Sequence, residues 1–516
     1  MNSQEKAAKI AVIGAGMAGL TATQRLIAGG AHVTLIEKSH AAGGRAATLE
    51  RDSFYLNQGP HALYKGGAAF EIFTQLNIAP AGSSPAPKRS LAILNGEALD
   101  LPVDPASIMV TKLLSMGEKM EYGMLMSNLS KVDQTTLQDV SLSTWLSDTV
   151  KSERVQDLFK AMVRLGTYCN NPDKMSAAAA IQQLVIALQR GVLYLDHGWQ
   201  SLVDAMLQLI RSQANSKQDA NLELDVNLGL DANLGQNSNL GQDTNLSSLV
   251  EIYSAEVTAL TLNRESGKEK IIVTINGEKH TFDAVVLALP PKQVSRLLKA
   301  SNKDSGTSSE TGSEIGSETS SEISSEKSSK TALDTAGLQA TLDNILPSHA
   351  ACLDVCLKQL PVSENTFAVG IDQPLYYSVH SNTAKLAESD HAMIHLAVYL
   401  PEGATGGAEQ ENQLLALLDM LQPGWQKELV YKRFLPNMSA SFGTATAAAN
   451  SSNGLATVTL PGVPNVYVCG DWVGSGHLLL DAAMHSAVAA AEAALSVVSS
   501  DTRATSAGAA KKEAYA

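Results

Sequence analysis

The sequence predicts an α/β protein built from two intimately packed domains. Its 516 residues exceed the length of one ordinary domain, and 44% of them are apolar, which is enough for a sizeable core. The chain opens with a strand, a glycine-rich turn, a helix and a second strand between Lys9 and Glu37. Strongly apolar strands recur at Phe282–Leu289 and Asn465–Cys469. This βαβ opening and the later buried strands together indicate a parallel sheet.

The first turn has the pattern of a dinucleotide-binding motif. The residues GAGMAG follow the strand Lys9–Ile13 and open a helix. Gly14 permits the tight turn, Gly16 lets the backbone approach a pyrophosphate, and Gly19 allows the helix to pack closely on the strand. The helix N-terminus presents free N–H groups to the phosphate charge. A chance glycine turn in a βαβ unit is the alternative.

Two neighbouring features narrow the choice of nucleotide. Glu37 closes the second strand, His32–Glu37, where its carboxylate would accept from both ribose hydroxyls and repel a 2′-phosphate, so NADP is disfavoured. Gly43-Gly44-Arg45 follows, and an arginine there can bring a bidentate cation to a pyrophosphate or a flavin edge. An ordinary basic loop is the alternative. The turn alone leaves NAD and FAD open.

Periodicity predicts the elements in the rest of the chain. From Ala68 to about Arg211 the pattern is mostly helical, and strands follow at Leu249–Leu260 and Glu269–Asn276. Strands and helices alternate through 350–435, and Asp481–Val498 is an alanine-rich helix. The amphipathic helical segments lie around Ser107–Leu129, Ser141–Thr149 and Ala177–Arg190.

Two low-complexity inserts interrupt this pattern. In 213–249 the pair Asn-Leu recurs with a six-residue period, which favours an expanded surface loop over a β-helix too short to bury a core. The segment 301–335 is rich in Ser, Glu, Gly and Thr and is expected to be disordered. The stretches 213–250 and 301–335 each carry a net charge of -4, from five acids and one Lys and from seven acids and three Lys. They supply -8 of the formal -14, so the folded part is only mildly acidic.

Composition excludes several classes of protein. The net charge of -14 argues against nucleic-acid binding. Four cysteines are too few for a disulfide scaffold, and Cys352 and Cys356 lack the second ligand pair of a zinc site, so no metal is expected. The N-terminus has no signal-peptide pattern, and no run of about 18 apolar residues occurs. We therefore expect a cytoplasmic protein.

Taken together, the motifs resemble the flavin amine oxidase/phytoene desaturase superfamily, to which protoporphyrinogen oxidase also belongs. The resemblance rests on GAGMAG with Glu37 and GGR, on QGPHALY, on VVLALPP, and on the closing VYVCGDWVGSGHLLLDAAMHSAVAAA. It covers nearly the whole chain apart from the two inserts and the residues after about Val498. The Gly-Pro-His and Gly-Asp-Trp segments look most like bacterial phytoene-dehydrogenase-like proteins.

The resemblance implies FAD as cofactor and a particular architecture. A Rossmann-type FAD-binding domain, with a parallel sheet plus a small antiparallel β-meander, would be interleaved with an α+β substrate domain. The expected boundaries are 1–70, 195–212, 250–300 and 455–498 for the FAD-binding domain, 71–194 and 336–454 for the substrate or cap domain, and 499–516 for a flexible tail.

It also implies a role for each matching residue. Gly14, Gly16 and Gly19 would bind the ADP pyrophosphate, Glu37 the ribose, and the backbone of Val257 the adenine. The residues implied at the diphosphate, ribityl and flavin side are Gly44, Arg45, Gly59, Pro60, His61, Gly470, Asp471, Ala482, Ala483 and Met484. Of these, the last three would open the final helix, whose N-terminus would stabilise negative charge on the reduced ring.

The chain departs from the family at the last helix. Asp481-Ala482 stands where relatives carry Glu-Gly or Pro-Gly, and Ala487 replaces a glycine. These departures weaken the inference that the chain shares the family's substrate, but they do not weaken the inference of FAD. A covalent flavin link through Cys469 is not supported, because that residue belongs to the buried strand before Gly470.

His61 is the catalytic candidate, because its motif places it beside the flavin ring. A histidine that only bonds loop backbone is the alternative. Tyr64, Tyr168 and His197 are cavity candidates, with packing at the core or rim as the alternative for each. Neither the flavin-contacting lysine nor the paired aromatic cage of many amine oxidases can be assigned, which disfavours an amine substrate.

Five methionines gather in the predicted helical insertion, at positions 109, 116, 120, 124 and 126. Flexible methionine side chains suit an apolar substrate mouth or a surface that touches a membrane peripherally. Ordinary packing in a helix core is the alternative.

Three functional hypotheses follow. The first is an FAD-dependent dehydrogenase or desaturase that removes hydride from an apolar, isoprenoid-like substrate and passes electrons to oxygen, a quinone or another acceptor. The second is a flavin amine oxidase that forms an imine and peroxide. The third is a non-catalytic, flavin-retaining binding protein, which the altered Asp481–Ala487 segment favours.

Overall fold

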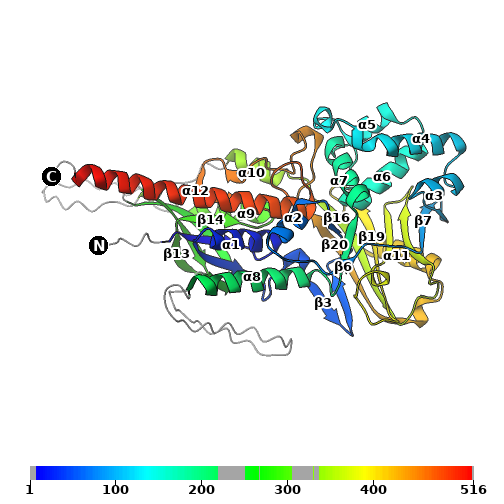
Figure 1. Ribbon diagram of the computed structural model, residues 1–516, viewed down its shortest axis with the longest axis horizontal. Helices are drawn as coiled ribbons and strands as arrows, with labels where there is room; N and C mark the ends of the chain where they lie inside the picture. Colours follow the sequence, from blue (N-terminus) through cyan, green and yellow to red (C-terminus); the bar gives the residue numbers. More distant parts are fainter. Residues whose placement is uncertain (1–6, 219–249, 266–267, 305–328, 331–335, 514–516) are drawn as a thin grey trace, which may run out of the picture.

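A computed structural model describes residues 7–218, 250–265, 268–304, 329–330 and 336–513. Two large sheets organise the molecule and lie one beyond the other along its longest axis (Figure 1). The first is built from the N-terminal, middle and C-terminal parts of the chain, and the second mainly from residues after 348. Most of the two inserts, including the hexapeptide repeats, lies outside the described residues, so the expectations for them stay predictions.

The first sheet has six strands in the order β10-β2-β1-β14-β22-β21. Five strands run parallel, and only β21 is antiparallel to its neighbour. The strands are β1 (Lys9–Ile13), β2 (His32–Glu37), β10 (Val250–Ser254), β14 (Ala284–Leu287), β21 (Thr459–Leu460) and β22 (Val463–Val468). This confirms the predicted parallel sheet.

Each face of this sheet packs against a different layer. Ile10 and Val12 point to a core shared with the helices α1 (Met17–Ala28), α2 (Ala68–Gln75), α8 (Gln200–Gln218) and α12 (Leu479–Glu513). Ala11 and Ile13 point the other way, to a core shared with the antiparallel strands β11 (Val257–Glu265), β12 (Lys268–Ile275) and β13 (Glu278–Phe282) and the helices α9 (Pro291–Asp304) and α10 (Ala336–Asp343). Because successive strand residues face opposite sides, one apolar run supplies both cores.

The segment predicted as a strand at Leu249–Leu260 is divided between two sheets. Its first half is β10, which runs parallel to β2, and its second half is β11, which pairs antiparallel with β12. The break falls at Ala255 and Glu256, where Ala255 N–H donates to Glu37 O at 2.7 Å. Periodicity could not find this break, because both halves are equally rich in β-branched and apolar residues.

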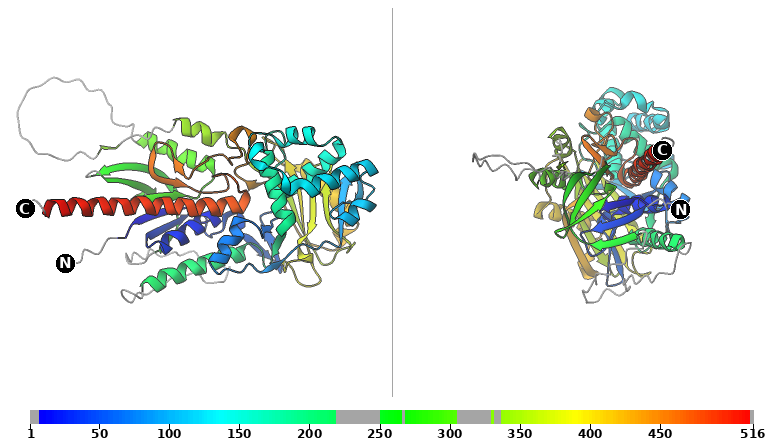
Figure 2. Two further views of the ribbon diagram at one scale, coloured as in Figure 1. Left: turned by 45° about the horizontal axis from the view of Figure 1, so that its top comes forward. Right: turned by 90° about the vertical axis from the view of Figure 1, so that its left-hand side faces the viewer.

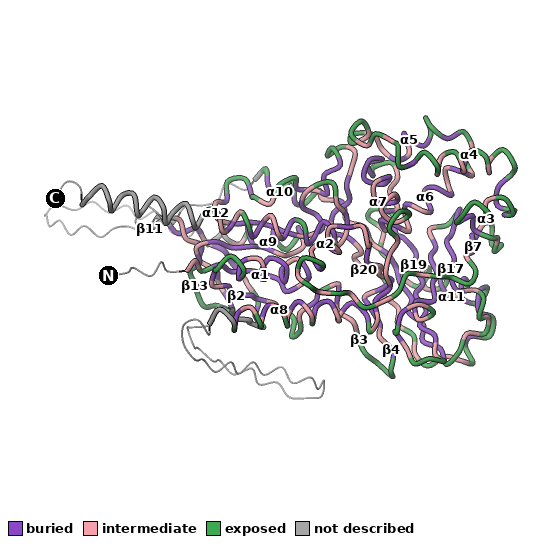
Figure 3. Tube along the Cα trace, in the orientation of Figure 1, coloured by how far each residue is buried: buried purple, intermediate pink, exposed green. Residues whose placement is uncertain are grey.

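The second sheet has seven strands in the order β20-β16-β19-β18-β17-β7-β8. Its strands are β7 (Arg89–Leu94), β8 (Glu97–Asp100), β16 (Ser348–Leu357), β17 (Asn365–Gly370), β18 (Leu375–Val379), β19 (Ala392–Leu400) and β20 (Leu429–Ser441). The helices α4 (Met116–Asn128), α5 (Leu142–Thr149), α6 (Glu153–Thr167) and α7 (Ala177–Arg190) cover one face, and α11 (Ala408–Leu421) covers the other. The inner strands are buried on both faces (Figure 3).

The segment 68–211 is mostly helical, as predicted, but it also contains the hairpin β7–β8, which was not predicted. Asn95 and Gly96 adopt positive φ angles of 49° and 77° and join the two strands. Asn-Gly between two apolar runs is a strong hairpin signal, so the sequence did contain the information. The pairing of β7 with β17, by contrast, joins residues that are far apart in sequence.

Short strands and one short helix complete the fold. They are β3 (Thr48–Arg51), β4 (Phe54–Asn57), β5 (Leu63–Tyr64), β6 (Gly82–Ser83), β9 (Val192–Leu195), β15 (Ser329–Lys330) and α3 (Pro105–Val110). β5 and β6 both pair with β9, so the chain returns to the first sheet just before α8.

The methionine cluster lies mainly on the surface. Met109, Met116, Met120 and Met124 are 60–64% exposed, whereas Met126 packs against the core under α4. Helix-core packing therefore holds for Met126 alone among these five. None of the five lines the cavity described below, so a substrate mouth is not supported either.

The last helix is longer than predicted. α12 begins at Leu479 and continues to Glu513, through residues that were expected to form a flexible tail (Figure 2). Alanine, which has the highest helix propensity, recurs throughout this segment. None of the helices in the described part of the chain combines the length and apolar character needed to cross a bilayer.

Candidate functional site

A cavity of about 380 Å³ opens where the parallel sheet meets the second sheet. Its wall includes the loops that follow β1, β14 and β22, at the carboxyl ends of parallel strands where ligands of such sheets bind. The wall is made of Gly14, Gly16–Ala18, Glu37, Gly43–Ala46, Pro60–Tyr64, Tyr168, Trp199, Ala288–Pro290, Gln293, Met438, Ala440, Phe442, Cys469–Trp472, Leu479–Asp481 and Ala483.

The glycine turn forms one end of the cavity. Gly14 has a φ of +103°, and its N–H donates to Ile36 O at 2.7 Å, which ties the turn to β2. A Cβ on Gly19 would lie 1.7 Å from Gly14 O, so this glycine allows the helix to approach the turn. A Cβ on Gly16 would have only Gly43 O within 4 Å, at 3.9 Å, so the space beside Gly16 is open to the cavity.

Glu37 holds the same turn from the end of β2. Its Oε2 accepts from Ala15 N–H at 2.7 Å and its Oε1 from Ser39 N–H at 2.9 Å. Both oxygens are thereby oriented while the side chain stays on the cavity wall. A carboxylate fixed in this place can accept further hydrogen bonds from vicinal hydroxyl groups.

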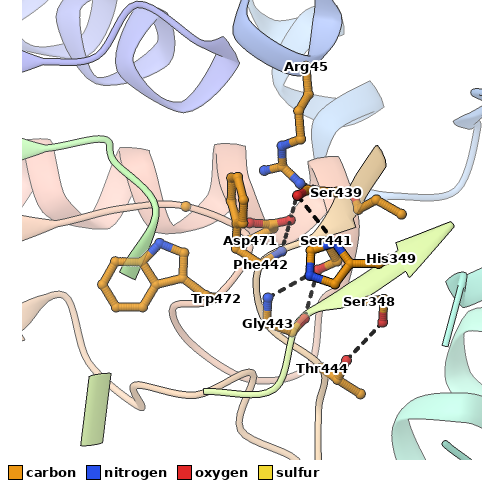
Figure 4. A network of polar contacts seen from close by, with 12 residues as sticks. Arg45, Ser348, His349, Ser439, Ser441, Phe442, Gly443, Thr444, Asp471 and Trp472 are labelled. Carbon is orange, nitrogen blue, oxygen red and sulfur yellow. Dashed lines mark hydrogen bonds and ion pairs between the residues drawn. The ribbon is translucent and has the colours of Figure 1, made fainter. Parts of the chain in front are cut away.

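Arg45 and Asp471 form an ion pair on the wall (Figure 4). Arg45 Nη1 donates to Asp471 Oδ2 at 2.6 Å and to Ala440 O at 3.0 Å, and its guanidinium stacks 4.2 Å from the centroid of the Phe442 ring. Phe442 N–H donates to the same Asp471 oxygen at 3.1 Å. Asp471 Oδ1 is buried and has no protein partner.

The loop that supports Phe442 is itself held by polar contacts. Ser441 Oγ–H donates to Gly443 O at 2.8 Å, and the hydroxyls of Ser348 and Thr444 lie 3.0 Å apart (Figure 4). Trp472 Nε1–H donates to Leu289 O at 3.0 Å and so joins the loops after β22 and β14. These contacts fix the part of the wall that carries Asp471.

His61 lies on the wall as a neutral imidazole. Its Nδ1 lies 2.9 Å from Gly59 O, and because a carbonyl only accepts, Nδ1 carries the proton and Nε2 is left as an acceptor. Burial lowers the pKa of His61 to about 4, so the ring stays uncharged at neutral pH. Its centroid lies 5.1 Å from that of Trp199, whose buried Nε1–H has no protein partner.

Two tyrosines line the same region. Tyr64 Oη–H donates to Gly166 O at 2.8 Å, and Tyr168 Oη–H donates to Pro60 O. Burial raises the pKa of Tyr64 to about 12 and that of Tyr168 well above its usual value. Both hydroxyls are therefore protonated and engaged with backbone. His197 is not on the wall; its ring packs edge-on against Tyr55, with centroids 5.2 Å apart.

Asp481 stands in the first turn of α12. Its Oδ1 accepts from Ala69 N–H at 2.8 Å, and burial raises the pKa of its carboxyl to about 6. The side chain fills the space beside Gly67, where a Cβ would lie 2.1 Å from Asp481 Oδ2. The departure noted in the sequence is thus accommodated by a glycine on a neighbouring loop.

Comparisons with known proteins show which flavin enzymes this chain resembles. The family model for flavin containing amine oxidoreductases matches residues 17–228. This match covers less than half of the chain, and it shows that this part of the chain is similar to flavin amine oxidases. A stretch of 66 residues is 41% identical to the 4,4'-diapophytoene desaturase (4,4'-diaponeurosporene-forming) of Staphylococcus aureus strain Newman. That match spans 13% of this chain and 13% of the length of that curated relative.

Solved structures with a similar fold align with nearly the whole chain. An oxidoreductase from Methanosarcina mazei has a TM-score of 0.61 at 15% identity, covering 93% of this chain and 98% of its own. Cyclohexylamine oxidase from Brevibacterium oxydans IH-35A has a TM-score of 0.60 at 14% identity, covering 96% and 100%. Because the sequence identities are this low, the likeness to these structures establishes the fold alone.

The wall fits FAD, the flavin cofactor expected from the match to flavin containing amine oxidoreductases. Asp471 Oδ1 is a buried acceptor without a protein partner, and Trp199 Nε1 is a buried donor without one. Gly16 leaves open space beside a helix N-terminus, which suits a pyrophosphate. The residues that would hold FAD are therefore Gly14, Gly16 and Glu37 at the nucleotide end, and Gly44, Arg45 and Asp471 at the diphosphate and ribityl groups.

The structure brings most of the predicted site residues onto one wall. Those on the wall are Gly14, Gly16, Glu37, Gly44, Arg45, Pro60, His61, Gly470, Asp471 and Ala483. Their individual contacts with FAD stay predictions.

Five predicted site residues do not line the cavity, and the geometry explains four of them. Gly19 packs the helix on the turn, and Gly59 faces Met438 and Cys352. Ala482 and Met484 are buried in α12, which starts at Leu479 instead of at Ala482. Val257 pairs with Ile275 in the meander, and its contact with adenine stays a prediction.

Several wall residues escaped the sequence reasoning. Trp199 precedes α8, and Met438 and Phe442 belong to the long strand β20 and the loop after it. No local motif marks Met438 or Phe442, because they reach the cavity only through the pairing of β20 with β16. Trp199 follows the turn residues His197 and Gly198, which was a usable signal that a loop precedes a helix.

Proposed function

We propose that this protein is an FAD-dependent dehydrogenase or desaturase that removes hydrogen from a C–C bond of an apolar substrate. One observation carries the proposal: on the described wall, every ionised side chain is already bonded to a protein partner. Glu37 binds two backbone N–H groups, Asp481 binds one, and Arg45 and Asp471 bind each other.

A cationic amine would need an anion or an aromatic cage to offset its desolvation. Asp471 is paired with Arg45, Glu37 stands at the nucleotide end of the wall, and His61 is neutral. The wall of the cavity also includes the apolar side chains of Leu63, Met438 and Leu479 and the rings of Tyr64 and Tyr168. Such a surface favours a substrate held by apolar contact rather than by charge.

Desaturation breaks two C–H bonds and forms one C=C bond, releasing the equivalent of a hydride and a proton. FAD, when bound, supplies the hydride acceptor. His61 carries its proton on Nδ1, so Nε2 is the wall's candidate acceptor for the released proton. The surrounding apolar side chains exclude water and hold the C–C bond, and oxygen or a quinone serves as the final electron acceptor.

Two relatives bear on the choice by their names. The Staphylococcus protein is a desaturase, and the Brevibacterium protein is an oxidase of cyclohexylamine. The first has the higher identity, but over a short stretch, and the second shares the fold alone. The wall chemistry supports the desaturase, and the amine oxidase is the rival outcome of the test.

The test is an anaerobic substrate screen followed through loss of flavin absorbance. Purified protein reconstituted with FAD is mixed with isoprenoid polyene precursors or with cyclohexylamine and putrescine, and peroxide and imine are assayed after oxygen is admitted. Bleaching by the isoprenoids alone supports the proposal. Bleaching by an amine with imine formation would replace it by the amine oxidase. A flavin that can be photoreduced but is bleached by no substrate would favour the non-catalytic binding protein.

A further inference from the structure

A row of polar side chains crosses the otherwise apolar second sheet. His395 on β19, Asp354 on β16 and Arg433 on β20 stand directly opposite one another in register. Asp354 Oδ1 accepts from His395 Nδ1–H at 2.6 Å, and its Oδ2 accepts from Arg433 Nε–H at 3.0 Å and Nη2–H at 2.5 Å. Asp354 and His395 are fully buried, and the Arg433 side chain is 14% exposed.

Arg433 connects this row to the loop that carries His61. Its Nη2–H also donates to the carbonyl oxygen of Asn57, the last residue of β4. The same carbonyl accepts from Gly59 N–H at 2.9 Å, and Gly59 O in turn accepts from His61 Nδ1–H at 2.9 Å. Asp354 is therefore linked to the imidazole on the cavity wall by a series of hydrogen bonds that passes through the backbone of Gly59.

The same face of the sheet touches the loop directly. Cys352 lies two residues before Asp354 and so points to the same side of β16. A Cβ on Gly59 would lie 3.1 Å from Cys352 Sγ and 2.9 Å from the terminal methyl carbon of Met438, which shows how closely the loop rests on the sheet. Gly59 has a φ of +81°, so the loop turns sharply at this contact.

A contribution to stability alone explains the Asp354–Arg433 ion pair poorly. Taking two charges out of water is so costly that replacing a buried ion pair by apolar residues is often neutral or stabilising. Cys352 and Cys356 lie on the same face of β16 as Asp354 and are fully buried, so an apolar residue at 354 would suit the strand. What an apolar pair could not supply is the donor to Asn57 O.

We propose that the Asp354–Arg433 pair positions the loop 57–61 against the cofactor cavity, so that Pro60 and His61 keep their places on its wall. Arg433 supplies the hydrogen bond to the loop, and Asp354 orients the guanidinium. His395 fixes the second carboxylate oxygen of Asp354. The inference rests on the proposed function in that the cavity is taken to hold FAD.

The test separates positioning from stability with a double variant. Arg433→Met alone removes the loop donor and leaves the Asp354 carboxylate without its cation, so both the thermal midpoint and the flavin signals fall. Asp354→Asn/Arg433→Met removes both charges and keeps an acceptor for His395. We expect the thermal midpoint to recover, while the visible circular dichroism of bound FAD stays altered and the Kd for FAD stays about tenfold weaker, as for one lost hydrogen bond from a charged donor.

A second readout needs no bound cofactor. Selective ¹⁵N labelling of histidine, with His61→Asn for assignment, reports the Nδ1-protonated tautomer of His61 in the apoprotein. In the double variant we expect this single tautomer to become a mixture. Because neither readout requires turnover, failure to find a substrate would count against the proposed function and leave this result standing.

Tyr377→Phe is the matched control. Tyr377 is buried in the same sheet, where its hydroxyl accepts from Gln422 Nε2–H at 2.9 Å and donates to Asn365 O at 2.9 Å, and it does not line the cavity. The Tyr377→Phe variant should have a lower thermal midpoint, with unchanged circular dichroism of the flavin and an unchanged His61 tautomer. The proposal is overturned if the double variant keeps wild-type dichroism and a single tautomer, or if Tyr377→Phe alters them equally.

Discussion

Arg45 Nη1 lies 2.6 Å from Asp471 Oδ2, although the two residues are 426 positions apart in the chain. The pair joins the loop after the first βαβ unit to the loop after the last strand of the parallel sheet. Asp471 is 1% exposed and the Arg45 side chain 35%, so the carboxylate depends on this partner for its charge balance. The ion pair therefore holds these two loops together on the wall of the cofactor cavity.

Arg45→Met should therefore lower both stability and FAD affinity. Removing one partner leaves the other charge buried, and we expect a loss of about 2–3 kcal/mol in the free energy of unfolding, less than for a fully buried pair. Urea unfolding of the apoprotein and FAD titration measure the two effects. Arg89→Met is the control: Arg89 and Asp100 are 50% and 55% exposed, and the loss should stay below about 1 kcal/mol. Equal losses in both variants would contradict the assigned role.

The glycines of the first turn should separate folding from cofactor binding. In Gly19→Ala the new Cβ would meet Gly14 O at 1.7 Å, so we expect a loss of about 3 kcal/mol in unfolding free energy together with loss of FAD. In Gly16→Ala the Cβ enters open space, so apoprotein stability should change by less than about 0.5 kcal/mol while FAD binds about tenfold more weakly.

Gly117→Ala is the control for both glycine substitutions. Gly117 lies in α4, and a Cβ added there would meet no atom within 4 Å, so alanine should stabilise by about 0.5–1 kcal/mol without affecting FAD. Unchanged FAD affinity in Gly16→Ala would show that the pyrophosphate does not approach this residue.

Asp481→Asn should stabilise the apoprotein at neutral and alkaline pH. The folded pKa of about 6 lies above the unfolded value of 3.8, so the carboxyl's favourable contribution is complete below 3.8 and is lost as pH rises through 6. Asparagine keeps an acceptor for Ala69 N–H and carries no charge. We expect a gain of about 1–2 kcal/mol near pH 8 that disappears by about pH 4. Urea midpoints across pH check this, and a gain independent of pH would contradict the assignment of charge burial as its cause.

His61 should contribute the opposite pH dependence. Its folded pKa of about 4 lies below the unfolded value of 6.5, so its contribution is complete above 6.5 and is lost as pH falls toward 4. His61→Asn should remove about 2–3 kcal/mol of the acid destabilisation seen between these limits. His40→Asn, at an exposed position, should leave the pH profile unchanged. If His61→Asn lost as much unfolding free energy at low pH as the wild type, the assignment of a neutral imidazole would be refuted.

Two methionines of α4 should respond differently to the same change. Met124 is 61% exposed, and Met124→Gln should alter the free energy of unfolding by less than about 0.5 kcal/mol. Met126 packs against the core, and Met126→Gln should cost about 1–2 kcal/mol. Thermal and urea unfolding of the two variants measure the difference, and equal costs would contradict the burial of Met126.

Local chemistry made much of the fold predictable. The strand, turn and helix around GAGMAG, the helix at Ala177–Arg190 and the parallel sheet were found because glycine conformation and apolar periodicity act over a few residues. The hairpin at Asn95-Gly96 carried an equally local signal. The division of Leu249–Leu260 between two sheets had no such signal, because both halves satisfy the same strand pattern.

By itself, the sequence determined the nucleotide-binding turn, the acid that closes β2 and the wall positions of Arg45, His61 and Asp471, because each depends on residues close in the chain or on a recognisable motif. Only the tertiary structure decided that Phe442 and Met438 complete the wall, that four of the five methionines face outward, and that Arg433 reaches the loop of His61. These outcomes depend on which distant strands pair and which faces become buried, and no local pattern specifies either.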